Sequence, residues 1–351
     1  MIVKNEEWVL GRTLPNLVKH LDEVIVVDTG STDRTVEIAQ ELGAKVFHFA
    51  WINDFSAARN ESLKHATGDW ILWIDADEFM KEEDLLALKG FLGQASNDSY
   101  QLELRECELD KYEFSNFYVR VKLFRNGRGS HFERPINEQV CAADGKVAGG
   151  DLIPNIYIYH WGGRVSAEKK QQKKERNIEL LSQAAEKNPK DPAYRFLLAN
   201  NFKEMGMLEQ AIKEFEQAIA TDPKGYLAAS AHAAQAWCHY KNKNGMEAFK
   251  SARRALELDQ NLPDAYNLIG IILGGAGKYD EALQVLDEVG KLDTSAAVTK
   301  NISMRQYKYT PFLYRGLIYD MAGQKEKARE AYLKAAEYEM TDELKEKLNG
   351  R

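Results

Sequence analysis

The stretch EVIVVDTGSTDRTVEIAQELGAKVFHF, residues 23–49, decides the fold class of this chain. Glu23 to Val27 is a short apolar and β-branched run, which predicts a strand that is buried on both faces. A Thr-Gly-Ser break follows, and then a helical pattern that ends at Gly43, a residue favoured just after a helix. Ala44 to Phe49 predicts the next strand. Strand, helix and strand in this order form a βαβ unit, so we expect an α/β fold with a mostly parallel sheet.

A second unit of this kind brings acidic residues to the end of a strand. The pattern predicts a helix over Phe55–His65 and a strand over Trp70–Ile74, which Asp75 and Asp77 follow directly. Ligands of open parallel sheets bind beyond the carboxyl ends of the strands. Side chains alternate along an extended segment, so both acids are expected to point the same way. Two carboxylates there suit Mg²⁺ or Mn²⁺, and such a cation suits a diphosphate. The alternative is that the acids cap the helix expected from Lys81 onward.

The second half of the chain repeats itself. Residues 166–188 read as a long charged helix that links the halves. Beyond it, Ala211, Ala248, Ala282 and Ala328 begin the same pattern of small and apolar residues, at spacings of 37, 34 and 46 residues. These spacings bracket the 34-residue period of tetratricopeptide helix pairs. We therefore expect a catalytic domain over 1–165, a linker helix over 166–188 and an all-α repeat domain over 189–351.

Four segments of the first half resemble family 2 glycosyltransferases of the GT-A fold. They are IVKNEE (2–7), VIVVDTGSTDRT (24–35), DFSAARNESL (54–63) and ATGDWILWIDADEF (66–79). With repeats attached, the chain is similar to a bacterial subgroup that includes the sublancin S-glycosyltransferase and flagellin-modifying enzymes. The resemblance implies inverting transfer of a sugar, of the glucose or N-acetylglucosamine type, from a UDP-sugar to a protein or peptide acceptor such as a flagellin or a small peptide.

The resemblance also implies which residues contact the nucleotide sugar: Val3, Glu6, Asp28, Arg59, Asp75 and Ala76. Asp28 would recognise the nucleotide base, and Asp75 would face the ribose and the metal. Asp28 has the alternative role of stabilising its own turn, and Arg59 that of a structural ion pair with an aspartate. Asp77 is expected to bind the Mn²⁺ or Mg²⁺ ion that bridges the diphosphate.

Two further residues are candidates from the acceptor part of this half, residues 99–163. Inverting transfer needs a general base that takes the proton of the acceptor. Glu138 is the first candidate, because KLFRNG (122–127) and HFERPINEQV (131–140) resemble a segment of the subgroup that keeps this glutamate. Its alternative is a surface or amide-binding glutamate. His160 ends an apolar strand. The resemblance implies that it completes the metal site, since GT-A enzymes often place a late His or Asp there, and imidazole suits Mn²⁺ better than Mg²⁺. Its alternative is a histidine that only makes structural hydrogen bonds.

Composition narrows the class of protein. The net charge of −7 argues against nucleic acid as a partner. The three cysteines (Cys107, Cys141 and Cys238) lack any CxxC spacing, which predicts free thiols and a cytoplasmic protein. No apolar stretch reaches the roughly 20 residues of a membrane span. The repeats are expected to bind the acceptor or a partner, or to mediate homodimerisation. Two alternatives remain: a transferase acting on a saccharide or a lipid-linked glycan, and a non-catalytic scaffold built on a decayed transferase.

Overall fold

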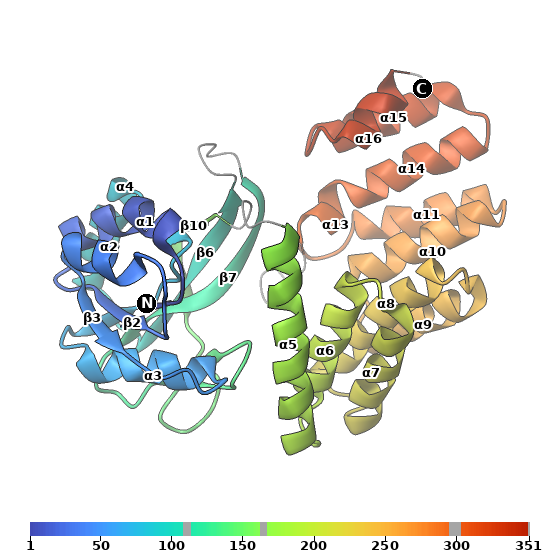
Figure 1. The fold of residues 1–351 in the computed structure, drawn as a ribbon. Coiled ribbons are helices and arrows are strands. Elements are labelled where there is room, and N and C mark those ends of the chain that lie inside the picture. Colours follow the sequence, from blue (N-terminus) through green and yellow to red (C-terminus); the bar gives the residue numbers. More distant parts are fainter. Residues whose placement is uncertain (108–113, 162–166, 295–302, 350–351) are drawn as a thin grey trace. The chain divides into compact units, whose positions relative to one another are not determined.

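The computed structural model describes residues 1–107, 114–161, 167–294 and 303–349 (Figure 1). The chain divides into two compact units, Met1–Ser166 and Ala167–Arg351. The helix expected as a linker is α5 (Ala167–Lys187), and it belongs to the second unit.

The first sheet contains the βαβ unit that residues 23–49 predict. Its strands pair in parallel in the order β1 (Ile2–Val3), β2 (Ile25–Asp28) and β3 (Lys45–His48). The connecting helices are α1 (Glu7–His20) and α2 (Thr35–Glu41). Val26 and Val27 in the middle strand are fully buried, as expected of a strand that is covered on both faces.

The second sheet is mixed, which refines the expected α/β class. Its order is β4 (Trp70–Leu72), β7 (Phe114–Arg125), β6 (Ser99–Cys107), β10 (Asp151–His160) and β5 (Glu78–Phe79). Only β6 and β10 pair in parallel among these strands. The unit also contains α3 (Phe55–His65), α4 (Glu82–Leu92) and a hairpin of β8 (His131–Glu133) and β9 (Gln139–Cys141).

The acidic segment after β4 is a turn. Strand β4 ends at Leu72, and the Glu78 N–H donates to the Asp75 carbonyl at 3.1 Å. The expectation that Asp75 and Asp77 point the same way from an extended segment is therefore wrong. The capping alternative is also wrong, because the residue at the N-cap of α4 is Lys81 and no side chain caps that helix.

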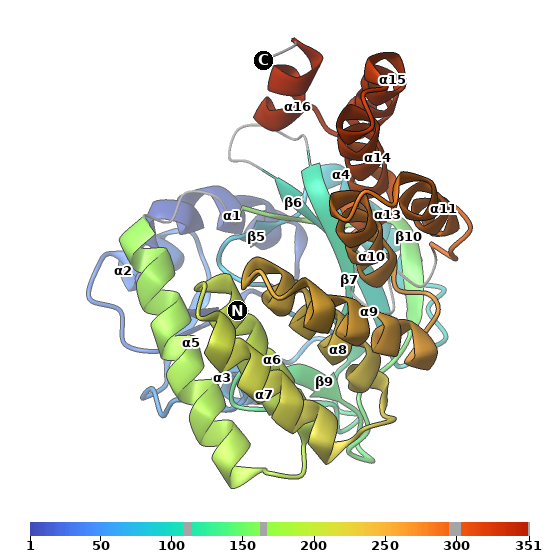
Figure 2. The same ribbon diagram turned by 90° about the vertical axis from the view of Figure 1, so that its right-hand side faces the viewer.

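The second unit is a stack of antiparallel helix pairs after α5 (Figures 1 and 2). Over the described parts of this unit the pairs are α6 (Pro192–Glu204) with α7 (Leu208–Thr221), α8 (Tyr226–Lys241) with α9 (Gly245–Leu258), α10 (Pro263–Gly275) with α11 (Tyr279–Val289), and α14 (Thr310–Met321) with α15 (Lys325–Ala336). Two shorter helices, α13 (Arg305–Lys308) and α16 (Asp342–Leu348), flank the last pair. These pairs confirm the predicted repeat domain.

The repeated positions have the same structural role in each helix pair. The four alanines that define the pattern are at most 1% exposed, because each lies where the two helices of a pair approach closely. Gly206, Gly277 and Gly323 turn the chain within their pairs at φ of +75° to +79°. Lys243, which replaces glycine in the second repeat, adopts the same left-handed conformation at φ +60°. The irregular second repeat thus keeps the turn geometry of the others.

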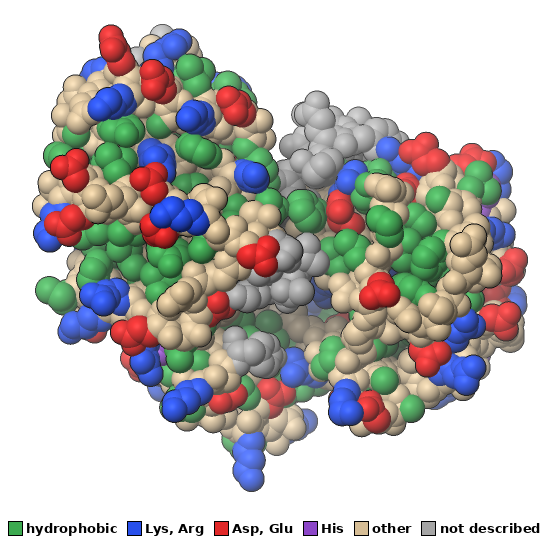
Figure 3. Space-filling view, turned by 180° about the vertical axis from the view of Figure 1, so that it is seen from behind, with side chains coloured by type: hydrophobic (Ala, Val, Ile, Leu, Met, Phe, Trp, Pro, Cys, Tyr) green, Lys and Arg blue, Asp and Glu red, His purple; other side chains and the backbone are tan. Residues whose placement is uncertain are grey.

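The surface carries charges of both signs. On the face drawn in Figure 3, acidic and basic side chains are interspersed over the described residues. No helix within the described ranges is long and apolar enough to cross a bilayer.

Close packing in the last repeat gives a test of the fold. A Cβ at Gly316 of α14 would lie 2.2 Å from the buried ring of Tyr332, whereas a Cβ at Gly275 of α10 would meet no atom within 4 Å. We expect Gly316→Ala to lower the free energy of unfolding by about 1–3 kcal/mol through overpacking. Gly275→Ala should be neutral or slightly stabilising, by up to about 1 kcal/mol, since alanine is the better helix former. Thermal unfolding followed by circular dichroism measures both, and equal behaviour would contradict the packing described.

Candidate functional site

Asp28 lies at the carboxyl end of the parallel sheet, level with Val3 and His48 on the neighbouring strands. Its buried carboxylate accepts hydrogen bonds from the N–H groups of Gly30 and Ser31, each at 3.1 Å. Gly30, at φ +102°, lets the chain turn back over the carboxylate. This geometry agrees with the turn-stabilising role. Recognition of a nucleotide base stays a prediction.

Val3 and Glu6 lie at the same edge of the sheet. The Val3 side chain is buried, and its carbonyl accepts from both the N–H and the hydroxyl of Thr29 at 3.0 Å. Glu6 precedes α1, donates its N–H to the Thr35 hydroxyl at 2.7 Å and accepts from the Trp8 indole at 2.9 Å. The structure thus brings both residues close to the turn that Asp28 organises.

Arg59 joins the acidic turn to a distant part of the chain. Its Nη2 donates to Asp75 Oδ1 at 2.7 Å and its Nε donates to Glu138 Oε1 at 2.6 Å. Arg59 as a whole residue is 6% exposed, and its Cζ lies 4.5 Å from the centre of the Trp73 ring. Burial acts to lower the pKa of Arg59, but Asp75 and Glu138 outweigh burial and raise it. The ion pair that was the alternative for Arg59 is therefore present.

The same arginine holds down the pKa of Asp75. Burial acts to raise that pKa, but the charge of Arg59, followed by that of Lys122, outweighs it and leaves the pKa well below its usual range. Asp75 therefore stays ionised at the edge of the sheet, with 36% of its side chain exposed.

Glu138 reaches Arg59 because its segment docks on α3. The Asn60 amide bonds both backbone groups of Phe132, at 2.8 and 2.9 Å. The Phe55 N–H, at the start of α3, donates to the Pro135 carbonyl at 2.9 Å. The sequence did not single out Asn60, although Asn60 follows Arg59 directly in the segment DFSAARNESL (54–63).

A buried ion pair holds the acidic turn, residues 75–78, in place. Lys122 Nζ lies 2.6 and 2.8 Å from the two carboxylate oxygens of Glu78, and the two side chains are 1% and 3% exposed. Glu78 also accepts from the Asp75 N–H at 2.8 Å. The Lys122 ammonium lies 3.5 Å from the centre of the Trp73 ring, so this ring is contacted by two cations. The sequence does not predict that Lys122 is buried, because a lysine in a strand of alternating pattern usually points to solvent.

Asp77 and His160 meet at the other side of the turn. Asp77 Oδ2 lies 3.3 Å from His160 Nε2, and the side chains are 28% and 24% exposed. The turn is tied to the end of β10 by a bond of 2.9 Å from the Trp161 N–H to the Asp77 carbonyl, and Ala76 is buried. Burial acts to lower the pKa of His160, but the hydrogen bond with Asp77 outweighs this and raises it.

These two side chains fit a divalent cation in part. Their separation of 3.3 Å is close to the distance of about 3.0 Å between adjacent ligands of an octahedral ion with bonds near 2.1 Å. The described residues contain no cluster of three or more His, Cys, Asp or Glu side chains that could hold a metal. Asp77 and His160 would therefore hold an ion only together with oxygens of a ligand such as a diphosphate.

Comparisons with known proteins agree with this division of the chain. Residues 1–148 match the family Glycosyl transferase family 2, and residues 196–263 match a tetratricopeptide repeat family. The glycosyltransferase SunS of Bacillus subtilis is 27% identical over 230 residues, which are 62% of this chain and 52% of SunS.

Other relatives cover shorter stretches. An uncharacterized glycosyltransferase of Rickettsia typhi is 42% identical over 173 residues, 46% of this chain and 59% of the relative. A TPR repeat-containing protein of Synechococcus elongatus is 40% identical over 161 residues, 46% of this chain and 39% of the relative. The chain thus spans about half the length of the curated relatives it matches. Among solved structures, the TPR protein YrrB covers 52% of this chain and 85% of its own, with 21% identity and a TM-score of 0.38.

The buried pair beneath the turn gives a prediction about stability. Lys122→Met leaves the Glu78 carboxylate buried without its cation, and we expect a loss of about 3–5 kcal/mol in the free energy of unfolding. Lys122→Met combined with Glu78→Gln removes both charges and should recover most of that loss. Lys19→Met, which breaks the exposed pair with Glu82, should cost less than about 1 kcal/mol. Urea denaturation measures all three variants. Equal midpoints for Lys122→Met and Lys19→Met would contradict the role of the buried pair.

Proposed function

We propose, from the family 2 glycosyltransferase domain that residues 1–148 form, that this chain transfers a sugar from a UDP-sugar to a protein or peptide acceptor in an inverting reaction. The observation that carries the proposal is the edge of the sheets, where Asp28, Asp75 and the pair of Asp77 with His160 follow strand ends. Ligands of open α/β sheets bind at such an edge.

Acidic side chains and a divalent cation would together hold the donor at the carboxyl ends of these strands. Asp77 and His160 would hold Mn²⁺ or Mg²⁺ together with the diphosphate oxygens. Such an ion neutralises the charge that develops on the leaving diphosphate. Asp75 stays ionised beside Arg59 and would face the ribose, and the buried pair below would keep the turn in one conformation before the donor arrives.

Glu138 is the proposed base. Its Oε1 is engaged by Arg59, so Oε2 is the oxygen that would take the proton from the acceptor as the acceptor attacks the sugar carbon. Arg59 would then serve both substrates, because it fixes the donor-side Asp75 and the acceptor-side Glu138 with one guanidinium.

The repeat unit supports a protein or peptide as the acceptor, because helical repeat arrays offer extended surfaces for polypeptides. The same array could serve homodimerisation. All three cysteines are free and buried, which supports a reducing compartment such as the cytoplasm.

The metal role of Asp77 is tested with purified protein, Mn²⁺ and a panel of nucleotide sugars. The wild-type chain should hydrolyse one UDP-sugar slowly, and chelation with EDTA should stop this hydrolysis. Asp77→Ala should lower the rate by about 100-fold or more. Asp144→Ala removes an exposed carboxylate far along the chain and should leave the rate unchanged. The proposal fails if no nucleotide sugar is bound or hydrolysed in the presence of the metal.

The role of Glu138 is tested with two substitutions. Glu138→Gln keeps an acceptor oxygen for Arg59 but cannot take a proton, so we expect kcat to fall by about 10²- to 10⁴-fold with the KM for the donor unchanged. Glu138→Ala also frees Arg59 and should raise that KM. Full activity of Glu138→Gln combined with a damaged Glu138→Ala would show that Glu138 only positions Arg59.

A further inference from the structure

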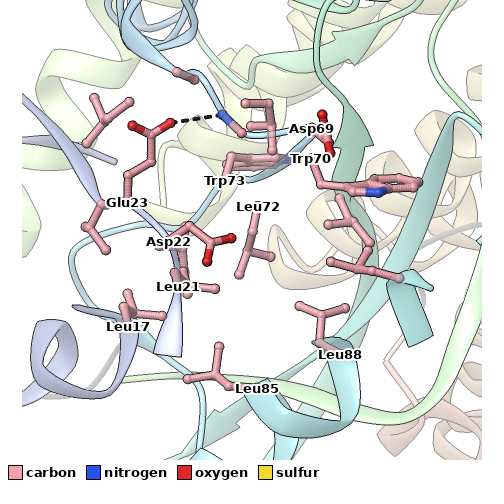
Figure 4. Close-up of a pocket in the computed structure, with 18 of the residues that line it drawn as sticks. Leu17, Leu21, Asp22, Glu23, Asp69, Trp70, Leu72, Trp73, Leu85 and Leu88 are labelled. Atoms are coloured by element: carbon pink, nitrogen blue, oxygen red, sulfur yellow. Dashed lines mark hydrogen bonds between the residues drawn. The ribbon is translucent and has the colours of Figure 1, made fainter. Parts of the chain in front are cut away.

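A cavity of about 440 Å³ in the first unit does not belong to the proposed cation site. It lies along β4 and at the start of β2, and Leu72, Leu85 and Leu88 are among its mainly apolar lining (Figure 4). Mn²⁺ and Mg²⁺ require oxygen or nitrogen ligands, which apolar side chains do not supply. The residues that complete a cation site therefore lie at the edge that carries Asp77 and His160.

One ring nitrogen of His160 has no partner. Nε2 faces Asp77 Oδ2 at 3.3 Å, whereas Nδ1 is shielded from solvent and has no hydrogen-bond partner among the described residues. A cation binds neutral imidazole through the lone pair of one nitrogen, and the proton then stays on the other. An ion held by Asp77 and Nε2 therefore requires an N–H at Nδ1, and a buried N–H without an acceptor is costly.

The second sheet places a carboxylate on each side of His160. In the strand register, His160 of β10 is paired with Glu78 of β5 and with Glu106 of β6. Paired residues on neighbouring strands direct their side chains to the same face of a sheet, and such strands lie about 4.8 Å apart. His160 therefore lies between Glu78 and Glu106 on one face of the sheet.

Only one of these two carboxylates can turn to Nδ1. Glu78 holds Lys122 Nζ at 2.6 and 2.8 Å and accepts from the Asp75 N–H, so turning it away would leave a buried ammonium without its partner. Glu106 is half-buried, and its carboxylate makes no hydrogen bond or ion pair within the part of the chain that the structure describes. Glu106 is thus the neighbour whose side chain can change its position at little cost.

We infer that Glu106 is a positioning residue of the cation site, whose carboxylate accepts the Nδ1–H of His160 when Nε2 binds a divalent cation. The inference rests on the proposed function, since it needs the ion at Asp77 and His160. A carboxylate in this outer position fixes the orientation of an imidazole ligand and raises its basicity. Glu106 acts through His160 and does not contact the ion. This role agrees with the lack of a cluster of three metal-binding side chains among the described residues.

The experiment measures Mn²⁺ binding to the full chain in the presence of UDP, by electron paramagnetic resonance of the free ion. Glu106→Ala should weaken Mn²⁺ binding by about 10- to 100-fold. Glu106→Gln keeps an oxygen that can accept the N–H but lacks the charge, so it should weaken binding less, and it gives the same test if the alanine variant is unstable. Glu103→Ala is the matched control and should leave binding unchanged, because Glu103 lies on the other face of β6 and pairs with Arg105.

Nuclear magnetic resonance of the ¹⁵N-labelled histidine rings, with Mg²⁺ and UDP bound, is the second measurement. The Nδ1–H proton of His160 should exchange with solvent about tenfold faster or more in Glu106→Ala than in the wild-type chain. A merely structural role of Glu106 would lower Tm without changing this proton.

The outcomes separate this inference from the proposed function. If Glu106→Ala binds Mn²⁺ as tightly as the wild-type chain while Asp77→Ala does not bind it, the inference is overturned and the proposed cation site stands. If Asp77→Ala binds Mn²⁺ as tightly as the wild-type chain, or the wild-type chain does not bind it, both are overturned.

Discussion

The arrangement of the first unit depends on one buried guanidinium. Arg59 stands between Asp75, on the turn after β4, and Glu138, on a segment more than 60 residues further along the chain. The two carboxylates are far apart in sequence, and the arginine pairs with both of them in one site. A buried arginine needs such partners, because an unpaired charge in this environment is strongly disfavoured. The requirement to satisfy Arg59 thus fixes the distance between the donor side and the acceptor side of the proposed reaction.

A second pair of charges works with the first. Glu78 and Lys122 lie below the turn, and Trp73 lies against both Lys122 and Arg59. Apolar residues of similar size would often be as stable as such a pair. What the charges add is geometry: Glu78 accepts from the Asp75 N–H, so the backbone that carries Asp75 and Asp77 is held in one turn. Preorganised groups of this kind stabilise developing charge without having to reorient during the reaction.

The sequence predicts much of this fold and less of the site. Strand and helix patterns locate β2, α2 and α3, because a buried apolar run and a helical period are local signals. The repeat pairs follow from alanine and glycine positions that packing demands. Asp75 and Asp77, however, form a turn with separate partners, since contacts with Arg59 and His160 decide their directions. Lys122 shows the same limit: whether a lysine in a strand points outward depends on a glutamate 44 residues away.

The central claim is that the edge formed by Asp28, the acidic turn and His160 binds a nucleotide diphosphate with a divalent cation. The most direct measurement is a crystal structure of the chain with UDP and Mn²⁺. The account predicts Mn²⁺ bound by Asp77 Oδ2, His160 Nε2 and diphosphate oxygens, with the uracil next to Asp28 and Arg59 still paired with Glu138. A nucleotide bound away from this edge, or Mn²⁺ held without Asp77 and His160, would contradict it.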